Sequence, residues 1–461
     1  MSLGTSPLDC SQRESIDALH AFHDLLLPET IANALKTSFF REHWSGRELK
    51  NVSRTNLAEL PTVGKEHIRA AGEAAQNRAG VVCNDVFTTG TTGNPLITVR
   101  SDREQRFIRN FFTRQLRERP ALRCLRGLEF KNPYHGHLVG VPASIHYHSV
   151  SVYDAGSFDY GRMTLLRSHN DANVEERCSV LTGLERCLRA FTLDTMQKFP
   201  NGFPSTALRL VVSYSQYLTA AWRQRLQDTW GAPAIDRFGV SEVFGGASQC
   251  LNCGWYHFEP FVIPEVIGAR SGEVLLTGLG LLALTALYPF QEAQPLVRYL
   301  TGDLVEVTHE LSCRPGTTAI KPLGRACYGV PEPASDRWLI TPASVLEAVD
   351  ELPEIARTPR FAGVGQVRDP ASIGHPKYRT RWCKGQSGPE VRIEFVPSRH
   401  LSDGRRSEIL SNIHSGIVKS NALLEDALRD GAASLKINTC DDIEEGDLIA
   451  QAHSGGVWSD A

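Results

Sequence analysis

The loop at residues 88–93 consists of threonine and glycine, which are residue types that can bind phosphate. It lies between two runs with β propensity, residues 81–87 and 96–99. Glycines allow the backbone to turn tightly and approach a ligand, and consecutive N–H groups and hydroxyls give the donors that a polyphosphate requires. No Gly-Lys-Ser/Thr follows at the spacing of a Walker A motif, and a Thr/Gly loop between strands is also typical of a plain hairpin. The candidate phosphate-binding residues are Thr88, Thr89, Gly90, Thr91, Thr92 and Gly93.

A second group of residues has the chemistry of a metal site. Cys250 and Cys253 have the spacing of a zinc knuckle, and His257 and Cys313 follow later in the chain. Four thiolate and imidazole ligands would form a closed Zn²⁺ site with a structural role. The alternative is four free residues in reduced loops.

Composition excludes several classes of protein. The 461 residues predict two or three domains, and 41% hydrophobic with 22% charged residues is typical of a globular protein with a large core. The 49 Lys and Arg nearly balance the 52 Asp and Glu, which argues against nucleic-acid binding through bulk charge. We find no secretory signal and no apolar run of membrane-spanning length, so we expect a cytoplasmic protein without membrane partners, whose eleven cysteines are reduced thiols or metal ligands.

The elements that must position these residues alternate between helices and strands. Apolar spacing predicts helices within 10–50 and over 102–118, 172–198, 219–230, 342–352 and 405–417. It predicts strands over 208–212, 234–239, 273–277, 305–308, 391–396 and 433–437. The alternation over residues 172–239 implies a mostly parallel, buried sheet. A proline-rich stretch at 328–336 reads as a linker, followed by a small α+β domain.

Four separated stretches resemble one family in their order. They are Leu-Pro-Thr-Val-Gly-Lys at 60–65, Asp-Arg-Phe-Gly-Val-Ser-Glu at 236–242, Pro-Leu-Val-Arg-Tyr-Leu-Thr-Gly-Asp at 295–303, and Gly-Arg at 324–325. With the Thr/Gly loop, this set resembles the adenylate-forming (AMP-forming acyl-CoA synthetase) superfamily, in its phenylacetate–CoA ligase-like branch. The resemblance implies an α/β fold: a large N-terminal adenylate-forming domain with mixed sheets flanked by helices at 1–325, and a small C-terminal α+β lid domain at 326–461.

The resemblance also implies roles for individual residues. The Thr/Gly loop would wrap the β- and γ-phosphates of ATP, Glu242 would hold Mg²⁺, and Ser241 would contact the α-phosphate. Asp303 would accept hydrogen bonds from the ribose hydroxyls, with Arg325 beside it. Glu242, Ser241 and Arg325 are thus the catalytic candidates. The remaining nucleotide-binding candidates are Ser215, Gln216, Asp236, Phe238 and Gly239, with Phe238 stacking on adenine. Singly, Glu242 could instead be a solvated carboxylate and Asp303 a turn residue.

The family resemblance bears on the metal site as well. Members of this branch often carry a Cys/His set in these two loops, which supports a Zn²⁺ held by Cys250, Cys253, His257 and Cys313. The register is imperfect, because alignment on Gly254 brings Tyr256 to the histidine position with His257 next to it.

Two departures from the family pattern concern positive charge. Asn94 stands where the loop normally carries Lys, and the tail 441–447 offers carboxylates where the small domain normally supplies a Lys to the α-phosphate. Lys436 is the nearest lysine, but it lies on the preceding predicted strand. A missing cation would cost several kcal/mol of transition-state stabilisation unless another group replaced it.

The expected function is therefore that of an AMP-forming ligase. It would adenylate a carboxylic acid with ATP and Mg²⁺, release pyrophosphate, and pass the acyl group to coenzyme A. The His- and aromatic-rich segment 134–153 favours an aromatic or polar acid. Two alternatives stay open: an amine acceptor, which would give an amide, and a nucleotide-binding protein with impaired turnover. A homodimer is also left open.

Overall fold

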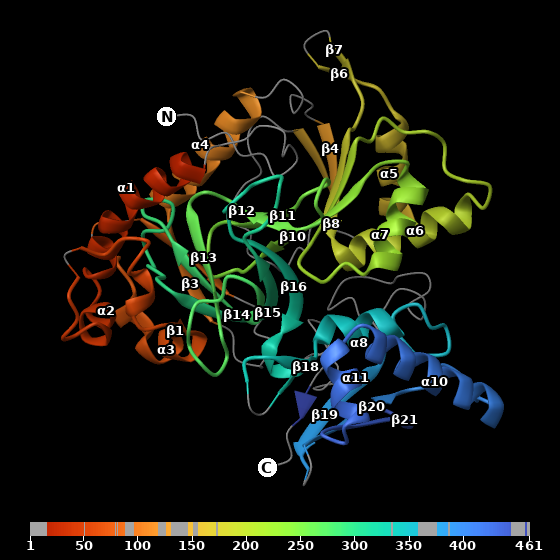
Figure 1. Cartoon of the computed structure of the whole chain (residues 1–461). Coiled ribbons are helices and arrows are strands. Elements are labelled where there is room, and N and C mark those ends of the chain that lie inside the picture. Colours follow the sequence, from red (N-terminus) through yellow and green to blue (C-terminus); the bar gives the residue numbers. More distant parts are fainter. Residues whose placement is uncertain are drawn as a thin grey trace. The chain divides into compact units, whose positions relative to one another are not determined.

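The chain divides into two compact units, each assembled from separate stretches of sequence (Figure 1). Unit 1 comprises Met1–Gly127, Asn132–His148 and Ile235–Lys321, and unit 2 comprises Leu128–Lys131, Ser149–Ala234 and Pro322–Ala461. The expected boundary after residue 325 stays a prediction. The structure is a computed structural model that describes residues 16–49, 51–78, 80, 82–87, 96–118, 126–130, 146–150, 155–171, 174–332, 335–357, 376–385, 388–443 and 457–458.

Unit 1 is built around a mixed sheet. Its strands follow the order β13-β14-β15-β16-β12-β11-β10, and β1 pairs with β15 in parallel. The pairings of β10 with β11, β11 with β12, β12 with β16, β13 with β14 and β14 with β15 are antiparallel. The strands are β1 (Val63–Gly64), β10 (Ala234–Gly239), β11 (Gly246–Gln249), β12 (Tyr256–Phe258), β13 (Val262–Ile267), β14 (Gly278–Ala286), β15 (Tyr299–Thr308) and β16 (Ala319–Arg325).

Short turns connect β10 to β11 and β11 to β12, and such turns join antiparallel neighbours. One expectation for this sheet was wrong. The strand expected over 273–277 is displaced: only Val274 forms an isolated bridge, to Ile267, and β14 begins at Gly278. The expected mixed α/β class, with sheets flanked by helices, is confirmed.

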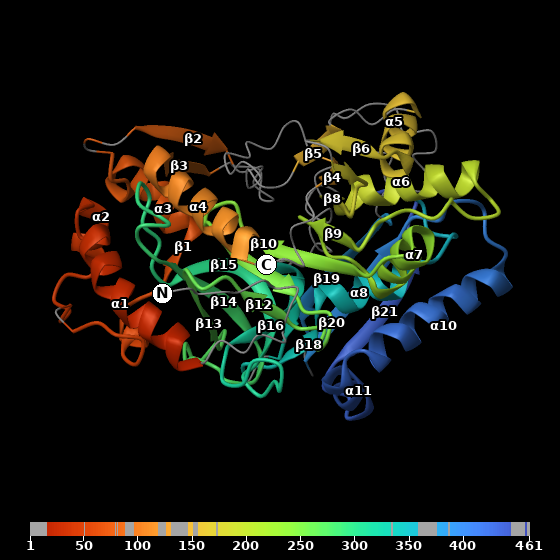
Figure 2. The ribbon, with the colours of Figure 1, turned by 90° about the horizontal axis from the view of Figure 1, so that it is seen from above.

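Helices of the first hundred residues cover this sheet. In both views α1 runs beside β13 (Figures 1 and 2). His23 and Thr30 lie on the buried side of α1, where His23 Nε2 is 2.8 Å from the carbonyl oxygen of Pro260 and Thr30 Oγ1 accepts from Tyr288 N at 3.0 Å. A separate antiparallel pair, β2 with β3, leads directly into α4. These elements are α1 (Ile16–Ala34), α2 (Ser38–His43), α3 (Lys65–Ala71), β2 (Cys83–Phe87), β3 (Ile97–Ser101) and α4 (Asp102–Glu118).

The first part of unit 2 is a smaller sheet with helices packed on it (Figure 1). Its strand order is β9-β8-β4-β5, with β8 and β9 parallel. The helix expected over 172–198 is correct only from Glu185, where α6 begins, because Val180–Leu184 forms the strand β8. A short apolar run such as this one does not distinguish a buried strand from a helix. The elements are β4 (Arg126–Phe130), β5 (His146–Val150), α5 (Ala155–Leu166), β6 (His169–Asp171), β7 (Val174–Glu176), β8 (Val180–Leu184), α6 (Glu185–Lys198), β9 (Leu210–Tyr214) and α7 (Ala220–Trp230).

The C-terminal part of unit 2 has the expected α+β composition. Helices α8, α10 and α11 lie against the sheet β21-β20-β19-β22, and Ile393, Ile409 and Ile413 are fully buried between them (Figure 1). The elements are β17 (Val330–Pro331), β18 (Trp338–Ile340), α8 (Pro342–Val349), β19 (Tyr378–Lys384), β20 (Pro389–Phe395), α10 (Asp403–Lys419), α11 (Ala422–Arg429), β21 (Ser434–Thr439) and β22 (Val457–Trp458).

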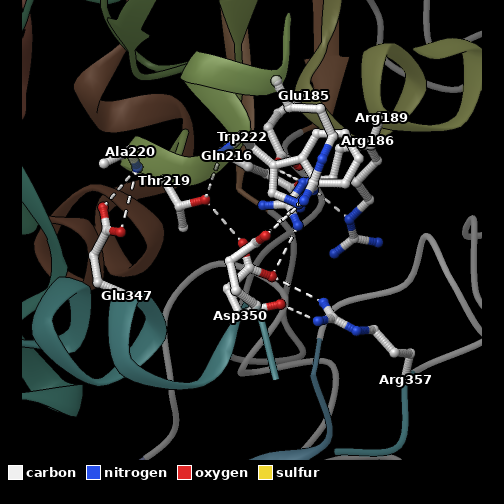
Figure 3. A network of polar contacts seen from close by, with 12 residues as sticks. Glu185, Arg186, Arg189, Gln216, Thr219, Ala220, Trp222, Glu347, Asp350 and Arg357 are labelled. Atoms are coloured by element: carbon white, nitrogen blue, oxygen red, sulfur yellow. Dashed lines mark hydrogen bonds and ion pairs between the residues drawn. The ribbon is translucent and has the colours of Figure 1, made fainter. Parts of the chain in front are cut away.

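A buried polar network fastens α8 to α6 and α7 inside unit 2 (Figure 3). Asp350, which ends α8, accepts hydrogen bonds from Arg189 Nη1, Arg357 Nη1 and Thr219 Oγ1, each at 2.9 Å. The side chains of Asp350 and Arg189 are each only 1% exposed, and Arg189 also pairs with Glu185. Charges this deeply buried are tolerated only when they are paired, so the network links the two sequence segments of unit 2 tightly.

Candidate functional site

The turn that carries Ser241 and Glu242 connects β10 to β11 in unit 1. Arg100 Nη2 donates to the carbonyl oxygen of Ser241 at 2.7 Å, and Gln291 Nε2 donates to that of Glu242 at 3.1 Å. Gln291 Oε1 also accepts from Phe244 N at 3.2 Å. Three hydrogen bonds from distant parts of the chain therefore fix the backbone on both sides of Glu242, which is what a preorganised ligand-binding turn requires.

Two cationic side chains, those of Lys65 and Arg100, contact this turn. Lys65 Nζ lies 3.3 Å from Glu242 Oε1; the lysine side chain is 23% exposed and the glutamate 9%. Arg100 is buried, its guanidinium lies 4.0 Å from the centre of the Phe244 ring, and its Nη1 is 3.7 Å from Glu104 Oε1. Burial lowers the pKa of Arg100. The turn is thus contacted by one buried cation, Arg100, and by one partly exposed cation, Lys65.

The first and third family motifs are bound to each other. Val63 and Gly64 form the parallel strand β1 against Tyr299 and Leu300 of β15. Arg298, which adopts a positive φ of 51°, donates to the carbonyl oxygens of Ala58 (2.7 Å) and Leu60 and pairs with Glu265. Because Lys65 follows β1 directly, this pairing also sets the position of the Lys65–Glu242 contact.

Asp303 lies in a bulge of β15. Leu300 pairs with Ala283 and Leu304 with Leu281, so the three residues 301–303 stand opposite the single residue Leu282. Gly302 permits the bulge through its φ of 79°. Thr301 Oγ1 stabilises it by accepting from Asp303 N at 3.1 Å and donating to Leu282 O at 3.2 Å. Bulges often direct a side chain into a binding site, and this one is compatible with the ribose role expected for Asp303.

The other nucleotide-binding candidates of unit 1 lie on β10. Asp236 is buried and its Oδ2 accepts from Tyr256 OH at 2.9 Å, whereas Phe238 and Gly239 are partly or fully exposed at the end of the strand. Gly239 pairs with Gly246 across the turn, where a Cβ on Gly246 would lie 2.2 Å from the carbonyl oxygen of Phe238. Packing alone therefore requires glycine at 246.

Three candidates lie in unit 2. Ser215 is exposed directly after β9 with a φ of 81°, an uncommon conformation for a residue other than glycine. Gln216 Oε1 accepts from Arg186 Nε at 2.8 Å. Arg325 is the last residue of β16, which begins in unit 1 and whose residues from Pro322 onward are counted with unit 2. A surface pocket of about 620 Å³ between α6 and α7 contains none of these residues, so the site is assigned from the motifs and not from this cavity.

The four predicted metal ligands come together. Their ligand atoms all lie within 4.8 Å of one another, and His257 Nε2 is 3.4 Å from the sulfur atoms of both Cys253 and Cys313. Cys250 and Cys253 belong to the tight turn between β11 and β12, which closes through the bond from Gly254 N to Cys250 O at 2.9 Å. His257 follows on β12, and Tyr256 is engaged with Asp236, so the structure selects His257 over Tyr256 for the cluster.

The protonation of this cluster follows from its burial. Burial raises the pKa of the Cys253 thiol to about 11, and burial with the charge of Arg314 lowers the pKa of His257 to about 4. At neutral pH the imidazole therefore has a free lone pair for a metal, whereas the thiol must lose its proton to bind. Cys253 and Cys313 are free thiols, but Cys250 is disulfide-bonded, so the expectation that every cysteine is reduced or a metal ligand was wrong for Cys250 in this structure.

Part of the predicted site lies outside the described residues. This applies to Asn94, to the tail 444–447 and to the loop Thr88, Thr89, Gly90, Thr91, Thr92 and Gly93. The strands on either side of the loop, β2 and β3, form an antiparallel pair. Lys436 lies on β21, as expected, and pairs with Glu390 at 3.0 Å.

The sequence reasoning did not assign Arg100 or Gln291, which hold the Ser241–Glu242 turn. Arg100 follows directly on a β-like run, and Gln291 stands in the polar stretch between β14 and β15. Neither position carries a motif, so only their contacts in the fold identify them.

Curated relatives match a short part of the chain. Phenylacetate-coenzyme A ligases from Thermus thermophilus and Aromatoleum evansii are 32% and 33% identical to it over 120 residues each, 25% of this chain. The one from Pseudomonas putida is 36% identical over 105 residues. The matches span about a quarter of the length of these relatives, 26%, 27% and 24% respectively. No family model matches the chain.

Solved structures match over a much larger part. The 2-hydroxyisobutyryl-CoA ligase in the postadenylation state aligns over 100% of this chain and 96% of its own, with a TM-score of 0.62 and 13% identity. ATP-bound MatB from Rhodopseudomonas palustris aligns over 78% of this chain and 64% of its own, with a TM-score of 0.51 and 15% identity. The chain has the fold of these ligases, and its resemblance to the adenylate-forming superfamily and the phenylacetate–CoA ligase-like branch is confirmed.

Proposed function

We propose that this chain is an AMP-forming ligase that activates a carboxylic acid with ATP and transfers the acyl group to coenzyme A. The observation that carries the proposal is the convergence of three separated motifs in unit 1. Segment 60–65 pairs with segment 295–303 through β1 and β15, and it reaches segment 236–242 through the Lys65–Glu242 ion pair. Motifs with no local reason to meet are thus assembled around one carboxylate.

The residues of this cluster suit the roles that the resemblance implies. Glu242 offers an almost buried carboxylate on a fixed turn, and oxygen ligands of this kind suit Mg²⁺. Mg²⁺, when bound, would neutralise phosphate charge during attack of the acid on the α-phosphorus. Ser241 would contact the α-phosphate, and Asp303 in its bulge would accept hydrogen bonds from the ribose hydroxyls. Phe238, Gly239, Ser215 and Gln216 would contribute to the adenine pocket, and Arg325 would act beside the nucleotide.

Coenzyme A is the proposed acceptor because the named relatives support it. Three matching relatives are phenylacetate-coenzyme A ligases, and 2-hydroxyisobutyryl-CoA ligase has been solved with its acyl-AMP and CoA. We propose an aromatic or polar acid as substrate. An amine acceptor has no comparable support among these proteins.

We further propose a structural Zn²⁺ held by Cys250, Cys253, His257 and Cys313. Four sulfur and nitrogen donors within 4.8 Å fit a tetrahedral ion, and the cluster would join the β11–β12 turn to the β15–β16 connection. Zinc binding by all four residues requires Cys250 in its reduced form.

The test is carboxylate-dependent exchange of labelled pyrophosphate into ATP across a panel of aromatic, aliphatic and amino acids. We expect exchange with at least one acid, formation of its CoA thioester, and a loss of at least about 100-fold in exchange for Glu242→Gln. Glu306→Gln, which breaks an exposed ion pair with Lys321 in the same unit, is the matched control. An active Glu242→Gln protein would refute the role of Glu242, and an amide in place of a thioester would refute the acceptor.

A further inference from the structure

The proposed reaction needs a cation near the α-phosphate. The two positions where the family carries a lysine, in the phosphate-binding loop and in the C-terminal tail, do not supply one in this chain. Asn94 replaces the loop lysine, and the tail offers acidic residues at 441–445. Lys436, which is exposed on β21, pairs with Glu390 of β20 at 3.0 Å. This inference rests on the proposed adenylation, in which negative charge is transferred to the departing pyrophosphate and must be stabilised.

Lys65 is placed to supply that charge. Its ammonium lies 3.3 Å from the carboxylate of Glu242, next to the Ser241 expected at the α-phosphate. Its backbone is anchored, because the preceding residues Val63 and Gly64 pair with β15. The Lys65 side chain is 23% exposed, so it is not enclosed on every side by protein.

Three arginines of unit 1 already have partners of their own. Arg100 donates to Ser241 O and lies against Phe244, and Arg103 pairs with Glu292 at 3.2 Å. Arg298 is held by two carbonyl oxygens and by Glu265. Within the described part of the chain, the ion-pair partner of Lys65 is Glu242. The carboxylate of Glu242 is also the group that would bind the metal ion.

We infer that Lys65 is a catalytic residue that exchanges partners when the nucleotide binds, leaving Glu242 to the metal ion and turning its ammonium to the α-phosphate. An ammonium and a divalent cation repel each other on one carboxylate, and the flexible lysine stem allows the charge to move. Arg100 is a positioning residue that holds the turn through its hydrogen bond to Ser241 O and keeps a positive charge close to it.

The chemistry at Lys65 involves charge only. A carboxylate oxygen of the acid attacks the α-phosphorus and forms the acyl–phosphate bond, while the bond to the β-phosphate oxygen breaks and its electron pair leaves with pyrophosphate. Lys65 contributes only positive charge, which neutralises the phosphate oxygens, so no proton acceptor is required.

The experiment compares the unaltered chain with Lys65→Met, Lys65→Arg and the control Lys321→Met, which removes another lysine–glutamate pair of unit 1. Pyrophosphate exchange gives kcat and the KM for ATP, and calorimetry gives the Mg²⁺ concentration for half-maximal ATP binding. For Lys65→Met we expect kcat to fall at least about 100-fold with a change in KM below about fivefold. The required Mg²⁺ concentration should also fall, because Glu242 loses its competing cation. Lys65→Arg should recover part of kcat, and Lys321→Met should resemble the unaltered chain.

Each outcome separates the two proposals. If the unaltered chain exchanges pyrophosphate and Lys65→Met keeps kcat within about threefold, or needs more Mg²⁺, the role of Lys65 is overturned while the proposed function stands. If the unaltered chain shows no exchange with any acid, the proposed function fails and the role of Lys65 fails with it. Thermal unfolding of each variant checks that the chain is folded.

Discussion

Asp303 shows how a bulge sets a single residue apart from the regular pairing of a strand. The bulge at 301–303 removes it from the regular ladder of β15, and Thr301 and Gly302 hold it there. We predict that Asp303→Ala weakens ATP binding by about 10- to 100-fold, the effect of losing hydrogen bonds to a charged acceptor. Calorimetric titration with ATP measures it, with Asp303→Asn expected to be intermediate. Unchanged affinity in the alanine variant would remove the ribose assignment.

His23 makes a prediction about pH at the same scale. Burial lowers the pKa of His23 from 6.5 to about 4, against the opposing effect of its hydrogen bond to the Pro260 carbonyl. Between these values the unfolded chain therefore binds a proton and the folded chain does not. The stability that the neutral ring contributes is therefore complete above pH 6.5 and is lost as the pH falls towards 4, by about 3 kcal/mol at most.

Denaturant unfolding at a series of pH values tests this assignment. His23→Gln keeps a donor for the carbonyl but cannot titrate, so its free energy of unfolding should fall less steeply between pH 6.5 and 4. Parallel curves for the two proteins would show that another group causes the decline.

At the scale of elements, the cysteine and histidine cluster connects the β11–β12 turn to the β15–β16 connection. We predict about one Zn²⁺ per chain in protein purified under reducing conditions without chelator, and less than about a fifth of that in Cys313→Ala. Metal analysis measures the content, with Cys327→Ala, an exposed cysteine outside the cluster, as control. Metal-free protein of equal thermal stability would refute the zinc site.

The buried polar network that connects α8 to α6 and α7 is a second feature at the scale of elements. Removing Asp350 would leave Arg189 buried without its main counter-charge (Figure 3). We predict that Asp350→Ala lowers the free energy of unfolding by about 3–5 kcal/mol, whereas Asp426→Ala, which breaks an exposed pair with Arg429, costs less than about 0.5 kcal/mol. Denaturant unfolding compares the two, and equal effects would mean that the network adds little stability.

On the scale of the whole molecule, the Asp350→Ala variant tests the division into two units. Unit 1 and unit 2 have separate hydrophobic cores, formed around Phe261 and Leu284 in one and around Phe191 and Ile393 in the other. Amide hydrogen exchange in Asp350→Ala should therefore accelerate in α6, α7 and α8 and stay unchanged in β13, β14 and β15. None of the described helices is long and apolar enough to span a membrane.

The sequence alone determined the features that have a local physical cause. Thr219 and Gly231 predict the limits of α7, because a threonine side chain caps the first turn and glycine adopts the left-handed conformation after the last. The C-terminal α+β segment likewise followed from periodicity, and the pairing of Cys250 with Cys253 followed from spacing. The family resemblance supported adding His257 and Cys313 to that pair.

Only the tertiary structure decided which distant residues meet. Arg100 contacts Ser241 across 141 residues and Arg298 reaches Leu60 across 238, and neither separation leaves a periodic trace in the sequence. The strand Val180–Leu184 depends on pairing with β9, which its apolar composition does not specify. Local sequence signals determine local conformation. The partner of a charged side chain such as Lys65 depends instead on how distant strands pair in the sheet, and this pairing assembles the candidate site.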